Sequence, residues 1–178
     1  LEKEDSQTPK IDVNKPLLKE ALLKASQFFQ FYLLHTKDGQ EALKYLYGRG
    51  YDLNFIKIYG LGFAPKNGEM FLKAMQEQKI DEKTLFLTGL LKKSQYGKTY
   101  PFFTDRITIP INDNFSSVIG FSSRKFKEDT FGPKYINSPE TYLFKKSKML
   151  FGMSYSRKKI AKQKKAILVE GQFDALSL

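Results

Sequence analysis

The chain has 178 residues, with 30 Lys and Arg against 19 Asp and Glu, and a net charge of +11. It contains no Cys and one His, which excludes a disulfide framework and a Cys-based zinc site. A hydrophobic fraction of 41% is too high for a disordered tail, and no apolar run approaches the roughly 18 residues that a membrane helix needs.

The first 90 residues are predicted to be mostly helical. Residues 1–14 are polar and mixed in charge, which indicates a linker. Asp38 and Asp52 are suited to cap helices, and a short extended piece is expected over 61–65. Apolar residues at helical spacing predict helices over 16–34, 39–47, 53–59, 69–79 and 82–88.

From about Leu91 the pattern changes from helical to extended. β-Branched runs at 106–111 and 117–122 are separated by turn residues and predict an antiparallel hairpin. Pro110 would have to sit at an edge or a bulge, because proline cannot donate to a strand ladder. Another strand is expected over 134–137.

The last part of the chain is predicted to begin an α/β unit. A helix is expected over 148–162, and the continuous apolar run 166–169 is typical of a strand buried on both faces. A helical pattern restarts at Phe173. The predicted fold class is therefore α+β: a helical first half, an antiparallel β-containing basic part, and then the first strand of a truncated α/β subdomain.

Positive charge is concentrated between Phe121 and Lys165, where 13 Lys and Arg accompany three acidic residues. Eight aromatic side chains are interleaved with them. Basic residues neutralise phosphates and aromatic faces accept unstacked bases, so this segment is a candidate surface for single-stranded nucleic acid. The structural alternative is a solvated basic surface over an aromatic core.

Two carboxylates mark a second candidate site. Glu170 follows the predicted buried strand and precedes Gly171, at the position where α/β sheets place ligands. Asp174 comes one helical turn later, so both carboxylates could reach one site, and their oxygens suit Mg²⁺. The alternative is that they stabilise the N-terminus of a helix.

Several segments together resemble the catalytic core of bacterial DnaG-type primase. The most specific is the KYINSPET run at Lys134–Thr141, and Leu168–Asp174 is similar to the opening of the family's TOPRIM subdomain. The other matching segments are Tyr45–Gly50, Gly60–Pro65, Arg106–Ile111, Val118–Arg124 and Leu143–Lys146. The resemblance divides the chain into a linker (1–14), the template-binding N-terminal subdomain of the core (15–147) and the beginning of a truncated TOPRIM subdomain (148–178).

The resemblance implies a cytoplasmic DNA primase, a DNA-directed RNA polymerase that synthesises short RNA primers for replication. Its partners would be single-stranded DNA template, ribonucleoside triphosphates and, through a C-terminal region outside this chain, the replicative helicase, with no membrane partner. Mg²⁺ or Mn²⁺ would serve the intact core, and Zn²⁺ only an upstream domain outside this chain. The chain by itself is expected to be inactive and mainly to bind template.

The resemblance also assigns site residues. Glu170 and Asp174 match the catalytic carboxylates, and Glu170 would bind metal together with acidic residues expected beyond Leu178. Nucleic acid and nucleotides would be bound by Arg106, Arg124, Lys134, Tyr135, Asn137, Lys145 and Lys146. Two departures are Ser122-Ser123 in place of a Gly-Gly pair and Gln172 in place of an aromatic residue.

Two other functions remain open from the sequence. One is another TOPRIM-fold enzyme of the topoisomerase or nuclease type, against which the KYINSPET run argues. The other is a non-catalytic module that binds single-stranded nucleic acid.

Overall fold

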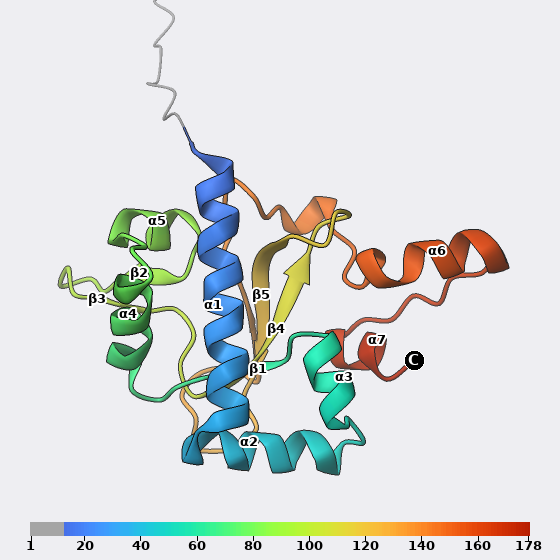
Figure 1. The fold of residues 1–178 in the computed structure, drawn as a ribbon, viewed down its shortest axis with the longest axis horizontal. Helices are drawn as coiled ribbons and strands as arrows, with labels where there is room; N and C mark the ends of the chain where they lie inside the picture. Colours follow the sequence, from blue (N-terminus) through green and yellow to red (C-terminus); the bar gives the residue numbers. More distant parts are fainter. Residues whose placement is uncertain (1–12) are drawn as a thin grey trace, which may run out of the picture.

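The computed structural model describes residues 13–178, so the linker predicted over 1–14 lies almost entirely outside the described residues. A long helix, α1 (Lys15–His35), crosses a four-stranded sheet (Figure 1). The other helices are α2 (Lys37–Gly48), α3 (Leu53–Ile58), α4 (Gly68–Glu77), α5 (Glu82–Leu87), the short 3₁₀ helix η1 (Lys146–Lys148), α6 (Met153–Gln163) and α7 (Gln172–Leu176). The five helices predicted in the first half are confirmed.

Capping side chains explain where most of these helices begin. The side chains at the N-caps of α1, α3, α4 and α5 accept hydrogen bonds from backbone amides two or three residues later: Asn14, Asp52, Asn67 and Asp81. The cap predicted at Asp38 is wrong. Thr36 has the extended backbone of a cap, and its Oγ1 accepts a hydrogen bond from the Gly39 amide at 3.0 Å. Asp38 lies in the first turn, where its carboxylate accepts from the Tyr32 hydroxyl at 2.8 Å.

The main sheet is antiparallel, with the strand order β1-β4-β5-β6. Its strands are β1 (Gly62–Ala64), β4 (Arg106–Asn112), β5 (Val118–Arg124) and β6 (Tyr135–Asn137). These strands confirm the predicted hairpin and the strand at 134–137. Pro110 lies opposite Phe121, beyond Thr108, where pairing with β1 ends. Strand β4 is therefore locally an edge at Pro110, as expected for a residue without a backbone donor.

Two hydrophobic layers cover the sheet. Phe121 of β5 is fully buried against α1, with its ring 5.5 Å from that of Phe29. Phe29 also stacks on Phe71 of α4 at 5.2 Å. The opposite face carries Ile107 and Ile109, which belong to a cluster with residues of α2, α3 and α7. A second hairpin, β2 (Leu91–Lys93) with β3 (Thr99–Pro101), lies beside α4 and α5 and was not predicted (Figure 1).

The buried strand predicted over 166–169 is wrong. Ile167 and Leu168 are 75% and 83% exposed, and the segment is an irregular connection between α6 and α7. A strand needs a hydrogen-bonded neighbour, and no strand of the described chain lies beside this run. The helix predicted over 148–162 is also shorter than expected, since α6 begins at Met153 and projects from the body of the molecule (Figure 1). Within residues 13–178, no helix is long and apolar enough to cross a membrane.

One ion pair joins α1 to the turn between β4 and β5. Lys19 Nζ lies 2.7 Å from Asp113 Oδ2, and Asp113 Oδ1 accepts from the amides of Phe115 and Ser117 at 2.9 Å. Burial alone would raise the pKa of Asp113, but these hydrogen bonds outweigh it and lower the pKa. A lowered folded-state pKa gives stability that is present above the unfolded value and lost as the pH falls through the folded value.

Asp113→Asn is therefore expected to reduce the free energy of unfolding by about 1 kcal/mol at pH 7, because the ion pair with Lys19 is lost. The difference from the wild type should shrink below the ordinary Asp pKa of 3.8 and vanish once Asp113 is protonated in both states. Urea denaturation of both proteins from pH 7 to pH 2 measures this. A difference that persists at pH 2 would contradict the assignment.

Candidate nucleic-acid interface

The register of the sheet places four of the polar residues on one face of β5 and β6. Arg124 lies opposite Ile107 on one side and Tyr135 on the other, and Ser122 lies opposite Asn137. Residues two apart on a strand share a face, so Ser122, Arg124, Tyr135 and Asn137 form a continuous polar strip. Three of the predicted site residues are thereby brought together.

Buried polar atoms on this strip have no partner in the described part of the chain. They are Ser122 Oγ, Arg124 Nε, Arg124 Nη1 and Asn137 Oδ1. Most buried polar side-chain atoms in folded proteins are hydrogen-bonded, and leaving one unpaired costs free energy. The strip therefore carries four buried polar atoms whose hydrogen bonds the described residues do not supply.

Arg124 is the centre of the strip. Its side chain is buried, with 8% exposed, and its guanidinium carbon lies 5.0 Å from the Tyr45 ring, 5.3 Å from Phe173 and 5.6 Å from Tyr135. Cation–π contacts of this kind hold the guanidinium plane in place but use none of its donors. Within residues 13–178, Arg124 forms no ion pair with a carboxylate.

Arg49 and Phe173 belong to the same group, although neither was predicted to be part of it. Arg49 follows α2, and its guanidinium carbon lies 5.1 Å from the Phe173 ring and 5.9 Å from the Tyr45 ring. Two guanidinium groups thus share the same two aromatic rings, and an anion placed between them would relieve their mutual repulsion. The signal in the sequence was that Arg49 lies in the matching segment Tyr45–Gly50, which was not assigned a binding role.

Arg106 occupies a different environment from Arg124. It is 3% exposed and lies on the other face of the sheet, since it precedes Ile107 on β4. Its Nη1 donates to Pro133 O at 2.8 Å and its Nη2 to Phe131 O at 2.6 Å. Burial lowers the pKa of Arg106, and the Asp105 carboxylate opposes this shift. This geometry makes Arg106 a positioning residue that anchors the loop between β5 and β6.

The KYINSPET run divides into two parts. Tyr135 and Asn137 lie on the polar strip, whereas the residues that follow build a turn. Ser138 Oγ accepts from the Phe121 amide at 2.9 Å, and Thr141 Oγ1 accepts from the amides of Leu143 and Phe144 at 3.2 and 3.0 Å. Ser138 thus ties the end of β6 to β5, and Thr141 closes the turn that follows.

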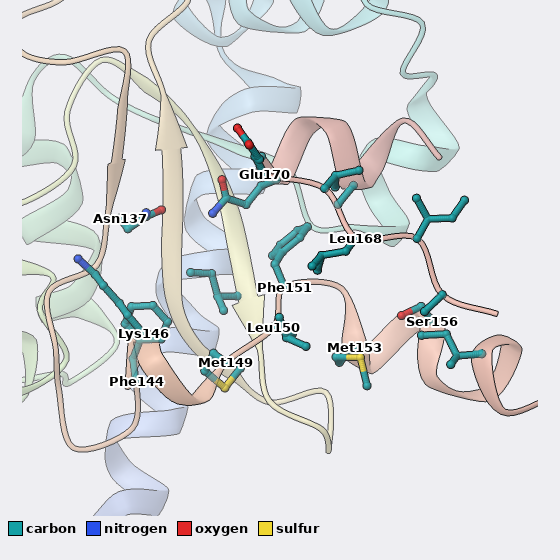
Figure 2. A pocket seen from close by; sticks show the side chains of 18 residues that line it. Asn137, Phe144, Lys146, Met149, Leu150, Phe151, Met153, Ser156, Leu168 and Glu170 are labelled. Atoms are coloured by element: carbon teal, nitrogen blue, oxygen red, sulfur yellow. The ribbon is translucent and has the colours of Figure 1, made fainter. Parts of the chain in front are cut away.

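A cavity of about 380 Å³ lies beside the strip, with mostly apolar walls. Figure 2 shows Asn137 and Lys146 on one side and Leu168 and Met153 on the other, with Glu170 between Asn137 and Leu168. The Lys146 amide donates to Glu140 Oε1 at 2.7 Å, so a turn holds this lysine at the cavity. The structure thus brings Glu170 and Lys146 to one cavity.

The remaining predicted residues lie around this centre. Lys134 is exposed, with its Nζ 5.9 Å from the Tyr135 ring. Lys145 is also exposed and lies 3.7 Å from Glu140 Oε2. Asp174, in the first turn of α7, does not line the cavity that Glu170 lines. Of the Ser122-Ser123 pair that replaces Gly-Gly, Ser122 belongs to the strip, and Ser123 Oγ on the opposite face donates to Ile136 O at 3.3 Å.

The carboxylates do not form a complete metal site. Glu170 is an exposed carboxylate that lines the cavity, but no group of three or more His, Cys, Asp or Glu residues suited to a metal ion occurs in the described part of the chain. A Mg²⁺ ion usually needs one or two carboxylates together with waters and substrate phosphates. Among residues 13–178, Glu170 is the one carboxylate that lines this cavity.

Comparison with known proteins gives a consistent result. Residues 28–157 match the family model of the N-terminal domain of the DNA primase catalytic core. A DNA primase of Chlamydia trachomatis is 47% identical over 165 residues, which are 93% of this chain and 27% of that protein. The chain therefore spans about a quarter of the length of such relatives.

Solved structures show the same fold. The RNA polymerase domain of Mycobacterium tuberculosis primase DnaG, in complex with a double-stranded DNA oligomer that has a 6-nucleotide overhang, matches with a TM-score of 0.82 and 31% identity, over 90% of this chain and 50% of that one. A DnaG primase catalytic domain bound to single-stranded DNA matches with a TM-score of 0.81 and 30% identity, over 91% of this chain and 50% of that one.

Proposed function

This chain belongs to the family of the DNA primase catalytic core, N-terminal domain, and from this premise we propose that it binds the single-stranded DNA template along the polar strip of β5 and β6. One observation carries the proposal. Arg124 is buried among three aromatic rings with Nε and Nη1 unpartnered and no carboxylate paired to it in the described part of the chain. Such a guanidinium is suited to a phosphate oxygen, which accepts charge-assisted hydrogen bonds.

The surroundings of the strip favour a polyanion over a small acid. Lys134, Lys145 and Lys146 are exposed around it, and Arg49 shares two of its rings. Each lysine or arginine that neutralises a phosphate releases a counterion, so affinity would fall steeply with salt. Tyr135, 41% exposed on the strip, offers a face on which a base can stack. Two relatives of known structure carry DNA, which supports this direction.

In the whole protein we propose primer synthesis from ribonucleoside triphosphates in the cytoplasm, with the replicative helicase as a partner. The 178-residue chain alone would bind template and not synthesise primers, because Glu170 is the one carboxylate that its described residues bring to the cavity. Mg²⁺ or Mn²⁺ would need further ligands besides Glu170 in a TOPRIM subdomain that residues 148–178 begin.

Lys134→Ala is expected to weaken binding of labelled single-stranded DNA several-fold and to reduce the slope of log affinity against log salt by about 0.7, the loss of one phosphate contact. Glu170→Gln should not weaken binding, because a carboxylate repels phosphate and its neutralisation removes no favourable contact. Fluorescence anisotropy at several salt concentrations measures both effects.

The matched control is Lys83→Ala, an exposed lysine on α5, which lies across α1 from the strip (Figure 1). It should change neither affinity nor slope. Equal weakening by Lys83→Ala and Lys134→Ala would show that DNA is attracted by the net charge of the protein as a whole. That result would argue against template binding at the strip.

A further inference from the structure

The loop between β5 and β6 presents a fully exposed aromatic side chain. Phe131 is 96% exposed, the highest value among the large hydrophobic residues described as exposed. Single exposed apolar side chains are common on protein surfaces, so exposure alone does not indicate a binding role. What distinguishes Phe131 is how its backbone is held and what surrounds it.

The loop is anchored from inside by two cationic side chains. Arg106 donates to the carbonyl oxygens of Phe131 and Pro133 at 2.6 and 2.8 Å. Lys125 Nζ donates to the carbonyl oxygens of Glu128 and Thr130 at 3.4 and 3.3 Å. The backbone is thus held on its inner side, while the Phe131 ring points away from the protein.

Neighbouring contacts restrict the loop further. Gly132 has a φ of +86°, which side chains rarely adopt, and a Cβ there would lie 3.2 Å from Arg106 Nη2, so another residue would strain the loop. Thr130 Oγ1 donates to Asp105 Oδ2 at 2.8 Å. An aromatic ring on a restrained backbone loses little conformational entropy when it binds a ligand.

The chemistry around Phe131 points to a nucleic-acid base. From Arg124 to Lys134 the chain carries four basic residues and two acidic ones, and Lys134 lies three residues from Phe131. The loop ends at β6, whose Tyr135 lies on the polar strip. Single-stranded DNA whose phosphates lie along the strip would therefore pass the loop, where its bases could stack on an aromatic ring.

We propose that Phe131 is a stacking platform for a base of the single-stranded template at the edge of the polar strip. The inference rests on the proposed function. It adds a contact with a base to the contacts with phosphates that are proposed for the strip. Arg106 is then a positioning residue for this platform. Stacking tolerates any base, so the contact would add affinity without sequence preference.

The absence of Trp makes a direct test possible. Phe131→Trp places a single indole on the loop, and its fluorescence should fall when single-stranded DNA binds, because the indole then stacks against a base. The control is Phe115→Trp, at an 86% exposed position in the turn between β4 and β5 that contains no lysine or arginine. Its fluorescence should hardly change.

Affinity completes the test. Phe131→Ala should weaken single-stranded DNA binding about tenfold without changing the salt slope, because no charge is lost, whereas Phe115→Ala should bind as the wild type does. Unchanged affinity of Phe131→Ala, or equal quenching at both tryptophans, would overturn the platform while leaving the template-binding strip intact. A wild-type chain that binds no single-stranded DNA at low salt would overturn both.

Discussion

Arg124→Met is expected to weaken single-stranded DNA binding by at least about tenfold while leaving the free energy of unfolding unchanged or slightly increased. The guanidinium is buried with two unpartnered nitrogens, so its desolvation costs stability that no intramolecular hydrogen bond of the described residues recovers. A methionine of similar volume would fill the space among Tyr45, Tyr135 and Phe173 and make favourable sulfur–aromatic contacts. Stability and binding should therefore change in opposite directions.

Arg106→Met is the matched control for this experiment. It removes the same group from a buried site, but there the guanidinium donates to two backbone carbonyls. Its loss should lower the free energy of unfolding by about 2–3 kcal/mol, because hydrogen bonds from a charged donor are the stronger kind. Urea denaturation and anisotropy on both variants separate the roles. If Arg124→Met destabilises the protein as much as Arg106→Met, Arg124 is structural and the template assignment fails.

Gly62→Ala is expected to lower the free energy of unfolding by about 3 kcal/mol, at the upper end of the usual cost of overpacking. A Cβ at Gly62 would lie 2.6 Å from the backbone carbon and the Cβ of Phe29, and 2.8 Å from the Gln30 amide nitrogen. These are atoms of α1 and cannot rotate away, so the helix would have to move off β1. A lower midpoint of urea denaturation would report the loss.

Gly48→Ala is the control, since a Cβ there meets nothing within 4 Å at the last residue of α2. It should change stability by less than about 1 kcal/mol, and in the favourable direction, because alanine is the better helix former. Equal midpoints for the two variants would mean that α1 does not approach β1 as closely as the structure shows.

The contact at Gly62 also matters for the interface. The residue after Gly62, Phe63, lies opposite Ile107, which in turn lies opposite Arg124 and then Tyr135 across the sheet. The packing of α1 on β1 therefore determines the position of the four paired residues Phe63, Ile107, Arg124 and Tyr135 across the sheet. A variant at Gly62 that still folds is expected to bind DNA less tightly for this reason.

Local patterns in the sequence determined much of the fold. Helical periodicity, capping side chains and β-branched runs depend on neighbours a few residues apart, so α1 to α5 and the β4–β5 hairpin could be predicted from them. The resemblance carried by Lys134–Thr141 could likewise be recognised without the structure, because it depends only on the order of residues in the sequence. It correctly indicated the family, and it singled out Arg124, Tyr135 and Asn137, which the sheet brings onto one strip.

The tertiary structure decided what each of these groups can do. Arg106 and Arg124 are both basic residues in matching segments, but the strand register places them on opposite faces of the sheet. There Arg106 donates to loop carbonyls, whereas Arg124 lacks hydrogen-bond partners among the described residues. The apolar run 166–169 has the composition of a buried strand, yet no strand of the described chain lies beside it to accept its hydrogen bonds. Hydrogen bonding and burial are set by residues far apart in the chain, as when Arg49 and Phe173 meet, and no local pattern carries that information.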